Sequence, residues 1–402
     1  MEKYDVIVVG AGPAGGQCAR EISSQGLKVL LAERNRDFTV NSYSSAGAPD
    51  EIMHAFQLPE TIIGSEWNKI TIHSSEDAHT WESKQRRGVV LDFMKLRAFL
   101  AQEAQKNGAT IKFGFSCQDY ENQQDRIIAT FKSQESKERH HIETKILVDA
   151  TGGERHVLAQ KLQFKANSFP STGIEYLVQV PEEIYQKWAS SLSLFMGHAW
   201  MPQGYSWIFP MEQNKLKVGV GRYFQDDNYV PHQQSYTYYL KLLMEKCLGS
   251  THFPILDKHG KTIHYTYGQE DLHYDGNVIA IGDAVSTINP LAFEGIRHAM
   301  KGAHIASKHI LEKLKGNVSA FEHYKTELDR HFGLSWKMCE MLMKFIYKEP
   351  KDKNIDLMLQ AWRGLSFDQI FDIAFHYKVF PILKFLTRYT YLSAKNKITF
   401  QN

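Results

Sequence analysis

The chain has 402 residues, a formal net charge of +2 and four cysteines without a C-x-x-C pair. A chain of this length can form more than one hydrophobic core. The balanced, dispersed charge argues against nucleic acid as a main partner, and the cysteine spacing gives no metal-binding motif. No charged, apolar leader and no run of about 18 apolar residues occurs, so we expect a cytoplasmic protein or one that lies on a membrane face.

The N-terminal segment has the pattern of a strand, a glycine-rich turn, a helix and a second strand. A strand-like segment over residues 4–9, apolar from Val6 onward, leads into Gly10, Gly12 and Gly15, and residues 29–32 form a second apolar run. These glycines permit a sharp turn, close approach of phosphate oxygens to the backbone, and close packing of the helix on the strand. The N-terminus of the helix favours an anion, so this pattern predicts a site for the pyrophosphate of a dinucleotide.

Glu33 follows the second apolar run directly. Its distance from Gly10 is close to the spacing of about 20 residues at which an acid accepts hydrogen bonds from the hydroxyls of an adenosine ribose. Such a carboxylate would also repel a 2'-phosphate. The alternative interpretation is a glycine-rich turn without a ligand.

The middle of the chain alternates between two kinds of pattern. Residues 36–90 are rich in Ser, His, Asp and Pro, and we interpret them as an excursion over the nucleotide site. A helical pattern from Leu96 that ends at Gly108, and later an apolar strand over residues 145–149, return the chain to the nucleotide sheet. Residues 155–270 contain strand-like segments between turn residues, which predicts a separate, mostly antiparallel substrate domain.

A third apolar strand ends at Gly282 and Asp283, and a helix is predicted from about Gly295 to Leu314. Asp283 would accept a hydrogen bond from a ribityl hydroxyl, and N–H groups near Gly295 would face the N1 and O2 edge of a flavin. The helix dipole would stabilise the negative charge of reduced flavin there by about 0.3 to 2 kcal/mol. A third strand so far downstream of a complete dinucleotide pattern favours FAD over NAD.

With these three segments, the chain resembles flavoproteins of the glutathione-reductase-like superfamily, in the branch that contains aromatic hydroxylases, flavin-dependent halogenases and geranylgeranyl reductases. Residues 201–210 read Met-Pro-Gln-Gly-Tyr-Ser-Trp-Ile-Phe-Pro. They are similar to the Tyr-x-Trp-x-Phe-Pro pattern of geranylgeranyl reductases rather than to the Trp-x-Trp-x-Ile-Pro pattern of halogenases. The resemblance covers about residues 1–315 and implies saturation of isoprenoid double bonds by reduced FAD.

The predicted fold class is α/β: a Rossmann-like FAD-binding domain, an interleaved and mostly antiparallel β substrate domain, and a C-terminal helical region. The expected domain ranges are, in that order, 1–55 with 90–154 and 271–330; 56–89 with 155–270; and 331–402. The residues expected to contact FAD are Gly10, Gly12, Ala14, Gly15, Glu33, Arg34, Ser45, Gly47, Arg97, Cys117, Gly282, Asp283, Pro290, Gly295 and Ile296.

Tyr205, Trp207 and Phe209 are spaced two apart, so on a strand they would present one aromatic face, suited to an apolar isoprenoid or aromatic substrate. The alternative is that the three are core aromatics of a half-buried sheet. No catalytic residue is assigned. The proton donor would be Tyr205, Tyr43, His54 or water, and the electron donor NAD(P)H or ferredoxin, because no second complete glycine pattern follows.

Two positions depart from the family pattern. Where the family has a Cys-rich or Ala-Glu-Gly-like turn, this chain has residues 42–47, Ser-Tyr-Ser-Ser-Ala-Gly. The family's FAD-contacting arginine aligns with Phe93, and we expect Arg97, one helical turn later, to replace it. The alternative for Arg97 is an exposed arginine on a helix.

The C-terminal seventy residues carry apolar positions at helical spacing. From Lys378 onward the chain has basic residues and no Asp or Glu. Such helices can rest on anionic lipid, so a membrane surface is a candidate partner. The alternative is a helical cap on the substrate domain with a solvated basic face.

Three other activities stay open. The first is a flavin-dependent monooxygenase or a halogenase-like enzyme, although no counterpart of the halogenase lysine stretch occurs. The second is an isoprenoid cyclase. The third is a non-catalytic prenyl-binding protein, which the intact Gly10, Glu33 and Asp283 disfavour.

Overall fold

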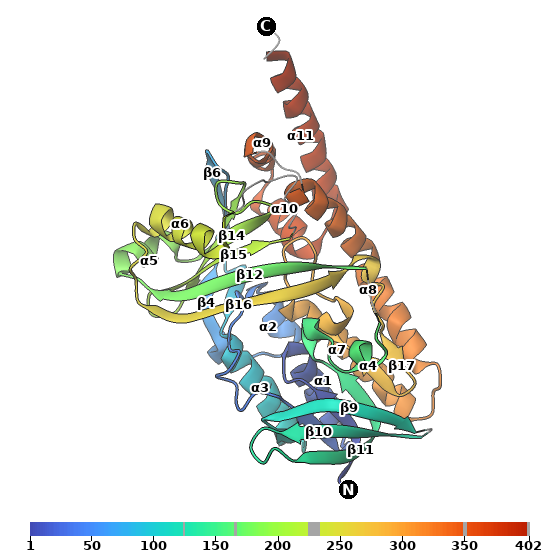
Figure 1. The fold of residues 1–402 in the computed structure, drawn as a ribbon. Coiled ribbons are helices and arrows are strands. Elements are labelled where there is room, and N and C mark those ends of the chain that lie inside the picture. Colours follow the sequence, from blue (N-terminus) through green and yellow to red (C-terminus); the bar gives the residue numbers. More distant parts are fainter. Residues whose placement is uncertain (124, 165–166, 224–233, 349–351, 400–402) are drawn as a thin grey trace. The chain divides into compact units, whose positions relative to one another are not determined.

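The computed structural model describes residues 1–123, 125–164, 167–223, 234–348 and 352–399 (Figure 1). The chain divides into two compact units, each assembled from three segments. Unit 1 comprises residues 1–46, 92–169 and 263–337, and unit 2 comprises residues 47–91, 170–262 and 338–402.

Unit 1 is built on an eight-stranded sheet with the order β17-β18-β11-β1-β2-β8, to which β10 and β9 are added beside β11. The five strands β18, β11, β1, β2 and β8 are parallel. Parallel strands are buried on both faces, which explains why β1 is apolar from Val6 to Val9 and why β2 is apolar throughout. The strands are β1 (Lys3–Val9), β2 (Val29–Ala32), β8 (Thr110–Lys112), β9 (Phe115–Gln123), β10 (Arg126–Ser133), β11 (Arg139–Asp149), β17 (Tyr274–Asp275) and β18 (Val278–Ala280).

Three helices of unit 1 pack together beside this sheet: α1 (Pro13–Ser23) contacts both α3 (Phe93–Lys106) and α7 (Ile296–Leu314) (Figure 1). The contact between α1 and α3 is close, because a Cβ on Gly16 would lie 2.9 Å from the Cβ of Leu100. Shorter elements complete the unit: η2 (Gly152–Glu154), α4 (Leu158–Lys161), η3 (Tyr267–Gln269) and η4 (Gly282–Val285). The α/β fold class and the first strand, turn, helix and strand are therefore confirmed.

Unit 2 contains a seven-stranded sheet with the order β16-β12-β15-β14-β13-β5-β6 and a three-stranded sheet with the order β3-β7-β4. In the larger sheet β12, β15, β14 and β13 are antiparallel, as predicted, whereas β13 and β5 are parallel. The strands are β3 (Gly47–Pro49), β4 (Ile63–Trp67), β5 (Lys69–His73), β6 (Ala78–Glu82), β7 (Gly88–Leu91), β12 (Ser168–Gln179), β13 (Ser191–Met196), β14 (Gly204–Met211), β15 (Lys215–Arg222) and β16 (Ile255–Thr266).

One face of the larger sheet forms the core of unit 2. Ile208, Val218 and Val220 of this face are fully buried and belong to one apolar cluster with Leu240 and Leu243 of α6 (Tyr236–Leu248). Helix α5 (Glu182–Trp188) contributes to the same cluster, and α2 (Glu51–Ala55) and η1 (Glu60–Ile62) lie in the first segment of the unit. Because side chains alternate along a strand, the opposite face of β14 carries the residues of odd number.

The C-terminal helices do not form a third compact unit. The elements are α8 (Ala320–Met343), η5 (Lys344–Lys348), α9 (Asp352–Trp362), α10 (Phe367–Phe371), η6 (Asp372–His376) and α11 (Val379–Thr399). Residues from 338 onward belong to unit 2, where the Trp81 indole donates a hydrogen bond of 3.0 Å to the Leu365 carbonyl and Trp67 stacks on Phe375 at 5.5 Å. The helical pattern was thus predicted, and its packing agrees with the alternative of a helical cap on the substrate domain.

Candidate functional site

The glycine turn after β1 has the geometry that a phosphate-binding turn requires. Gly10 has a φ of +105°, and a Cβ there would lie 2.5 Å from the Ala150 carbonyl oxygen. A Cβ on Gly15 would lie 1.8 Å from the Gly10 carbonyl oxygen, so only glycine allows this packing of α1 on β1. A Cβ on Gly12 would meet no described atom within 4 Å. Gly12 therefore forms a cradle at the N-terminus of α1 that a phosphate group can fill.

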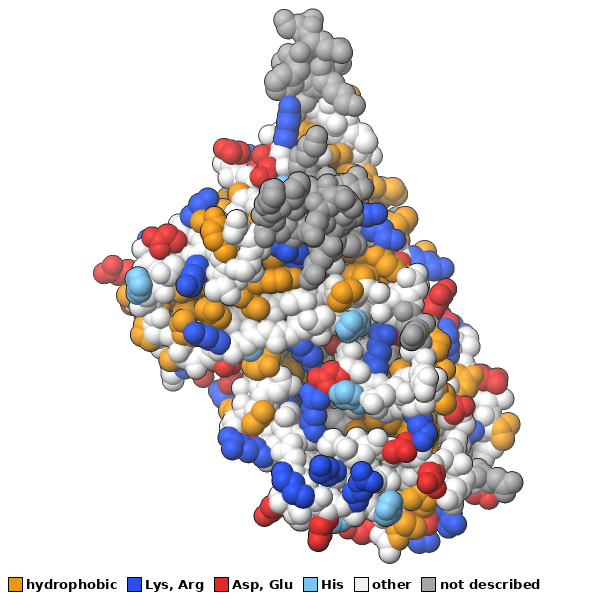
Figure 2. All heavy atoms as spheres, in the orientation of Figure 1, with side chains coloured by type: hydrophobic (Ala, Val, Ile, Leu, Met, Phe, Trp, Pro, Cys, Tyr) orange, Lys and Arg blue, Asp and Glu red, His pale blue; other side chains and the backbone are white. Residues whose placement is uncertain are grey.

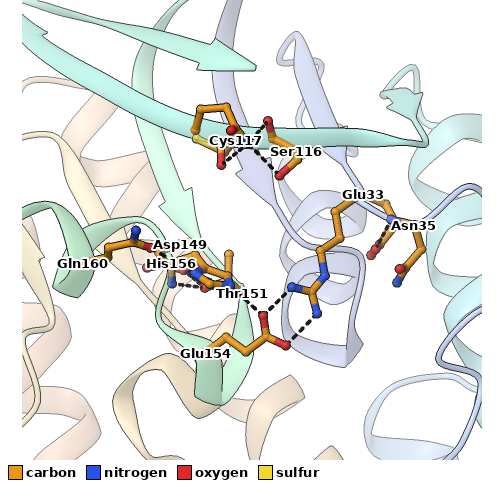
Figure 3. Close-up of polar contacts among 11 residues, drawn as sticks. Glu33, Asn35, Ser116, Cys117, Asp149, Thr151, Glu154, His156 and Gln160 are labelled. Carbon is orange, nitrogen blue, oxygen red and sulfur yellow. Dashed lines mark hydrogen bonds and ion pairs between the residues drawn. The ribbon is translucent and has the colours of Figure 1, made fainter. Parts of the chain in front are cut away.

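Glu33 lies at the end of β2, next to this turn, and is buried. Its carboxylate accepts hydrogen bonds from the Ala11 backbone N–H at 3.0 Å and from the Asn35 backbone N–H at 2.9 Å. Figure 3 shows Glu33 and Asn35 beyond the end of this strand. The acid is thus held beside the glycine turn, where the ribose contact was predicted.

Arg97 is buried, with 3% of its surface exposed, so the alternative of an exposed helix arginine is wrong. Its guanidinium donates hydrogen bonds to the carbonyl oxygens of Ala11 at 3.1 Å and Asn41 at 2.9 Å, and its Nη2 lies 3.4 Å from Glu33. Burial lowers the pKa of Arg97, while the charge of Glu33 opposes that shift. Arg97 therefore ties the glycine turn, the acid and the loop at residues 40–41 together.

Arg34 pairs with Glu154 of η2, and its Nη2 lies 2.6 Å from Glu154 Oε1. The hydrogen bond with Glu154 raises the pKa of Arg34. Asp149, at the end of β11, accepts hydrogen bonds from the backbone N–H groups of Thr151 at 3.0 Å and Leu158 at 2.9 Å. Glu154 was not among the predicted site residues, although Gly152 and Gly153, which follow the strand ending at Asp149, mark a turn just before it.

Cys117 lies on β9, near the strand ends that carry Glu33 and Asp149 (Figure 3). Burial raises the pKa of its thiol to about 12. A protonated thiol is a poor nucleophile, so a contact of Cys117 with a nucleotide would not involve thiolate chemistry.

The third predicted segment reaches the same region of unit 1. Gly282, the first residue of η4, has a φ of +65°, and a Cβ there would lie 2.7 Å from the Ala14 Cβ. A Cβ on Gly295 would lie 3.7 Å from Asp283 Oδ1. Gly295 is the N-cap of α7 and Ile296 is its first residue. The structure thus brings Ala14 and Asp283 together with the beginning of α7.

A polar turn that the sequence analysis did not identify shapes the loop before α7. The buried Asn289 side chain accepts hydrogen bonds from the backbone N–H groups of Leu291 at 2.8 Å and Ala292 at 3.1 Å. The Asn289 N–H in turn donates to the Glu294 carbonyl oxygen at 3.0 Å. Pro290, also predicted to contact FAD, is buried within this turn.

Ser45 and Gly47 fall in different units. Ser45 is half-buried in unit 1, whereas Gly47 begins β3 of unit 2, and a Cβ on Gly47 would lie 3.3 Å from Phe209 Cε2. Of the candidate proton donors, Tyr43 is half-buried in unit 1 and His54 is exposed on α2. Their contacts with FAD or with substrate stay predictions.

The three aromatic residues of β14 share one face but differ in environment. A Cβ on Gly219 of the neighbouring strand would lie 2.2 Å from the Trp207 indole, so this ring covers a site that lacks a side chain. The Trp207 Nε1–H donates a hydrogen bond of 2.6 Å to Glu175. Tyr205 is half-buried with its ring 5.6 Å from Trp207, whereas Phe209 is 8% exposed and packs beside Gly47.

Neither a metal cluster nor a membrane-crossing helix is found in the part of the chain that the structure describes. No group of three or more His, Cys, Asp and Glu side chains among these residues is placed to hold a metal ion. No described helix is both long and apolar enough to cross a bilayer.

The fold and the glycine–acid turn define a dinucleotide-binding α/β protein. The family model of the FAD binding domain matches residues 3–332, so the chain belongs to this family. A digeranylgeranylglycerophospholipid reductase of Haloferax volcanii is 28% identical over 322 residues, which cover 76% of this chain and 75% of the relative. FAD as the cofactor and the resemblance to geranylgeranyl reductases are therefore confirmed.

Solved structures share the fold. A geranylgeranyl bacteriochlorophyll reductase-like protein from Thermoplasma acidophilum superposes with a TM-score of 0.81 at 20% identity, and the alignment covers 99% of both chains. A flavin-dependent brominase superposes with a TM-score of 0.69 at 16% identity over 97% of this chain and 99% of its own. The reductase-like protein is thus the more similar of the two.

Proposed function

We propose that this protein is an FAD-dependent reductase that saturates carbon–carbon double bonds of a geranylgeranyl-type lipid chain. The observation that carries this proposal is the position of Trp207 over glycines. Cβ atoms on Gly219, Gly221 and Gly173 would lie 2.2, 3.4 and 3.6 Å from its indole. An aromatic surface beside strands that lack side chains suits an extended apolar substrate. The names of the relatives support this substrate class.

Bound FAD, once reduced, supplies the hydride for such a reaction. The residues of this chain have three tasks around it. The turn with Gly12 and the N-terminus of α1 hold the pyrophosphate, and Glu33 binds the ribose. The N-terminus of α7 at Gly295 favours negative charge on the flavin.

A proton must also reach the second alkene carbon. Tyr205 lies on the same face of β14 as Trp207, with the ring centroids 5.6 Å apart. We propose Tyr205 as the leading candidate for the proton donor because of this position, and Y205F tests it. The electron donor is proposed to be NAD(P)H or ferredoxin.

Anaerobic turnover of the FAD-loaded protein tests the reductase function. The flavin is reduced photochemically, so neither electron donor is needed, and a digeranylgeranylglycerophospholipid is added. Mass spectrometry should show the gain of two hydrogens for each double bond. A reduced, FAD-loaded protein that adds no hydrogen contradicts the proposal. An oxygen-dependent gain of oxygen would indicate a monooxygenase, and isomerisation without added hydrogen would indicate a cyclase.

We also propose that helix α11 rests on anionic lipid. Phe380, Leu383 and Tyr391 of this helix are 73%, 55% and 67% exposed. At 3.6 residues per turn they fall on one face, and the exposed residues Lys384 and Arg388 lie along the edge of that face. Figure 2 shows hydrophobic and basic side chains next to one another along this helix.

The opposite face of α11 is packed, since Ile382 and Phe385 are buried. The exposed apolar stripe is therefore additional to the residues that anchor the helix in unit 2. No Asp or Glu follows Asp372 in the sequence. Positive charge beside an apolar stripe matches the surface of a bilayer with anionic headgroups.

Flotation with phosphatidylcholine vesicles, with and without phosphatidylglycerol, tests the membrane proposal. We expect flotation only with the anionic vesicles at low salt, and its loss in the variant F380S/L383S/Y391S. The control L256S removes an exposed leucine of β16, which is 50% exposed, and should float like the wild type. Absence of flotation of the wild type on anionic vesicles contradicts the proposal.

A further inference from the structure

The first turn of α7 carries a buried ionic cluster that the reductase proposal does not use. Arg297 Nε lies 2.7 Å from Glu294 Oε1, and Arg297 Nη2 lies 2.8 Å from Glu294 Oε2. His298 Nε2 lies 3.1 Å from the same Oε2. The side chains of Glu294, Arg297 and His298 are only 5%, 15% and 6% exposed. The cluster directly flanks Gly295, the N-cap of α7.

Aromatic residues of unit 1 hold the cluster in place. The His298 ring makes an edge contact with Trp336, with ring centroids 4.8 Å apart, and a second with Phe332 at 5.7 Å. The Trp336 Nε1–H donates a hydrogen bond of 3.0 Å to the Ile288 carbonyl oxygen. The cluster is thus joined through Trp336 to the loop that precedes α7.

The protonation state of Glu294 follows from these contacts. Burial by itself would raise the pKa of Glu294, but the charges of His298 and Arg297 and their hydrogen bonds outweigh burial. They hold this pKa well below its usual range, so the carboxylate is ionised at neutral pH. A negative charge therefore lies next to the helix end at which the reduced flavin is proposed to place its own negative charge.

We propose that Glu294 and Arg297 are positioning residues that together set the reduction potential of the bound FAD. The negative charge of the Glu294 carboxylate alone would oppose electron uptake by the flavin. The Arg297 guanidinium, which is hydrogen-bonded to this carboxylate, cancels that effect. Asp283 also adds negative charge near Gly295, whereas His298 and Lys301 contribute positive charge. His331 lies near these cations, and burial lowers its pKa to about 4, so it is neutral at neutral pH. This inference needs FAD in its site but is independent of the isoprenoid substrate.

The midpoint potential of the FAD-loaded protein, measured during photoreduction with reference dyes and without substrate, tests the inference. E294Q should raise the ratio of reduced to oxidised flavin at a fixed potential by about tenfold, which is about 30 mV for a two-electron couple. R297Q should lower that ratio by a similar factor. The double variant E294Q/R297Q should return near the wild-type potential, because both charges are then absent. R297K keeps the charge and should stay near the wild type.

A matched control is a second carboxylate that pairs with residues farther along α7. Glu327 of α8 accepts hydrogen bonds from Lys308 and His309 of α7, both at 2.9 Å, so it is also a carboxylate between a cation and a histidine. These partners lie about 18 Å from the start of α7 at 1.5 Å per residue. E327Q should leave the potential unchanged. The inference is overturned if E294Q and R297Q shift the potential in the same direction, or if neither shifts it. If the E294Q variant does not bind FAD, the difference in potential between R297Q and R297K tests the inference instead.

Discussion

Gly282 lies against Ala14, so closely that a Cβ on Gly282 would be 2.7 Å from the Ala14 Cβ. Gly282 begins η4 after the third nucleotide-side strand, and Ala14 lies in the first turn of α1. The contact joins two segments that are far apart in sequence and that were each predicted to bind FAD. The glycine turn and Asp283, which are predicted to bind the pyrophosphate and the ribityl chain, thereby belong to one structural unit.

The first prediction concerns this contact. G282A should lower the thermal midpoint and the FAD content, because the new methyl group pushes η4 away from α1 and alanine is strained at a φ of +65°. We expect a loss of about 1 to 3 kcal/mol. G26A is the matched control, since Gly26 has a φ of +76° but a Cβ there would meet no described atom within 4 Å. Equal effects of the two substitutions would show that the contact with Ala14 is unimportant.

The second prediction separates cofactor binding from folding in the glycine turn. G12A should fold normally but lose FAD, because its methyl group enters the phosphate cradle and meets no described atom within 4 Å. G15A should unfold or melt early, because its Cβ would lie 1.8 Å from the Gly10 carbonyl oxygen. Flavin absorbance after gel filtration and circular dichroism check the pair. Retention of FAD by folded G12A would contradict the assignment of the cradle.

The third prediction concerns the Trp207 surface and depends on the reductase proposal. G219A should displace the indole and raise the KM for the lipid substrate at unchanged FAD content, because its Cβ would lie 2.2 Å from the ring. G173A should behave like the wild type, since the corresponding contact with Trp207 is an ordinary 3.6 Å. Steady-state kinetics of both variants would give the KM values to be compared. A normal KM for folded G219A would remove Trp207 from the substrate site.

The fourth prediction is a pH dependence of stability that arises from His73. Burial lowers the pKa of this histidine to about 4, and its ring stacks on Phe195 at 4.2 Å. The unfolded chain, in which the pKa of a histidine is about 6.5, binds the proton more tightly. The contribution of His73 to stability is therefore present above pH 6.5 and is lost as the pH falls from about 6.5 to about 4.

Urea denaturation at pH 7.5 and pH 5 measures this effect. H73F keeps an aromatic ring beside Phe195 but cannot bind a proton, so it should lose less stability than the wild type between the two pH values. The expected difference is about 2 kcal/mol at pH 5. An identical loss in both proteins would mean that His73 does not cause the pH dependence.

The sequence by itself determined the nucleotide-binding elements of this protein and the cofactor. The reason is that the pattern of Gly10, Gly12 and Gly15 between two apolar strands is local, and its chemistry follows from steric freedom and from the end of one helix. The motif at residues 201–210 likewise predicted the relationship to geranylgeranyl reductases that the relatives confirm.

The tertiary structure alone decided which side chains meet. Arg97 is buried because carbonyl oxygens of Ala11 and Asn41 receive its hydrogen bonds, and helical periodicity contains no information about those partners. Glu154 reaches Arg34 only because β11 and β2 flank β1 in one sheet. The ionic cluster of α7 is buried because α8 covers it with aromatic rings. Burial and long-range hydrogen bonds depend on packing, and packing is fixed only when the whole unit has folded.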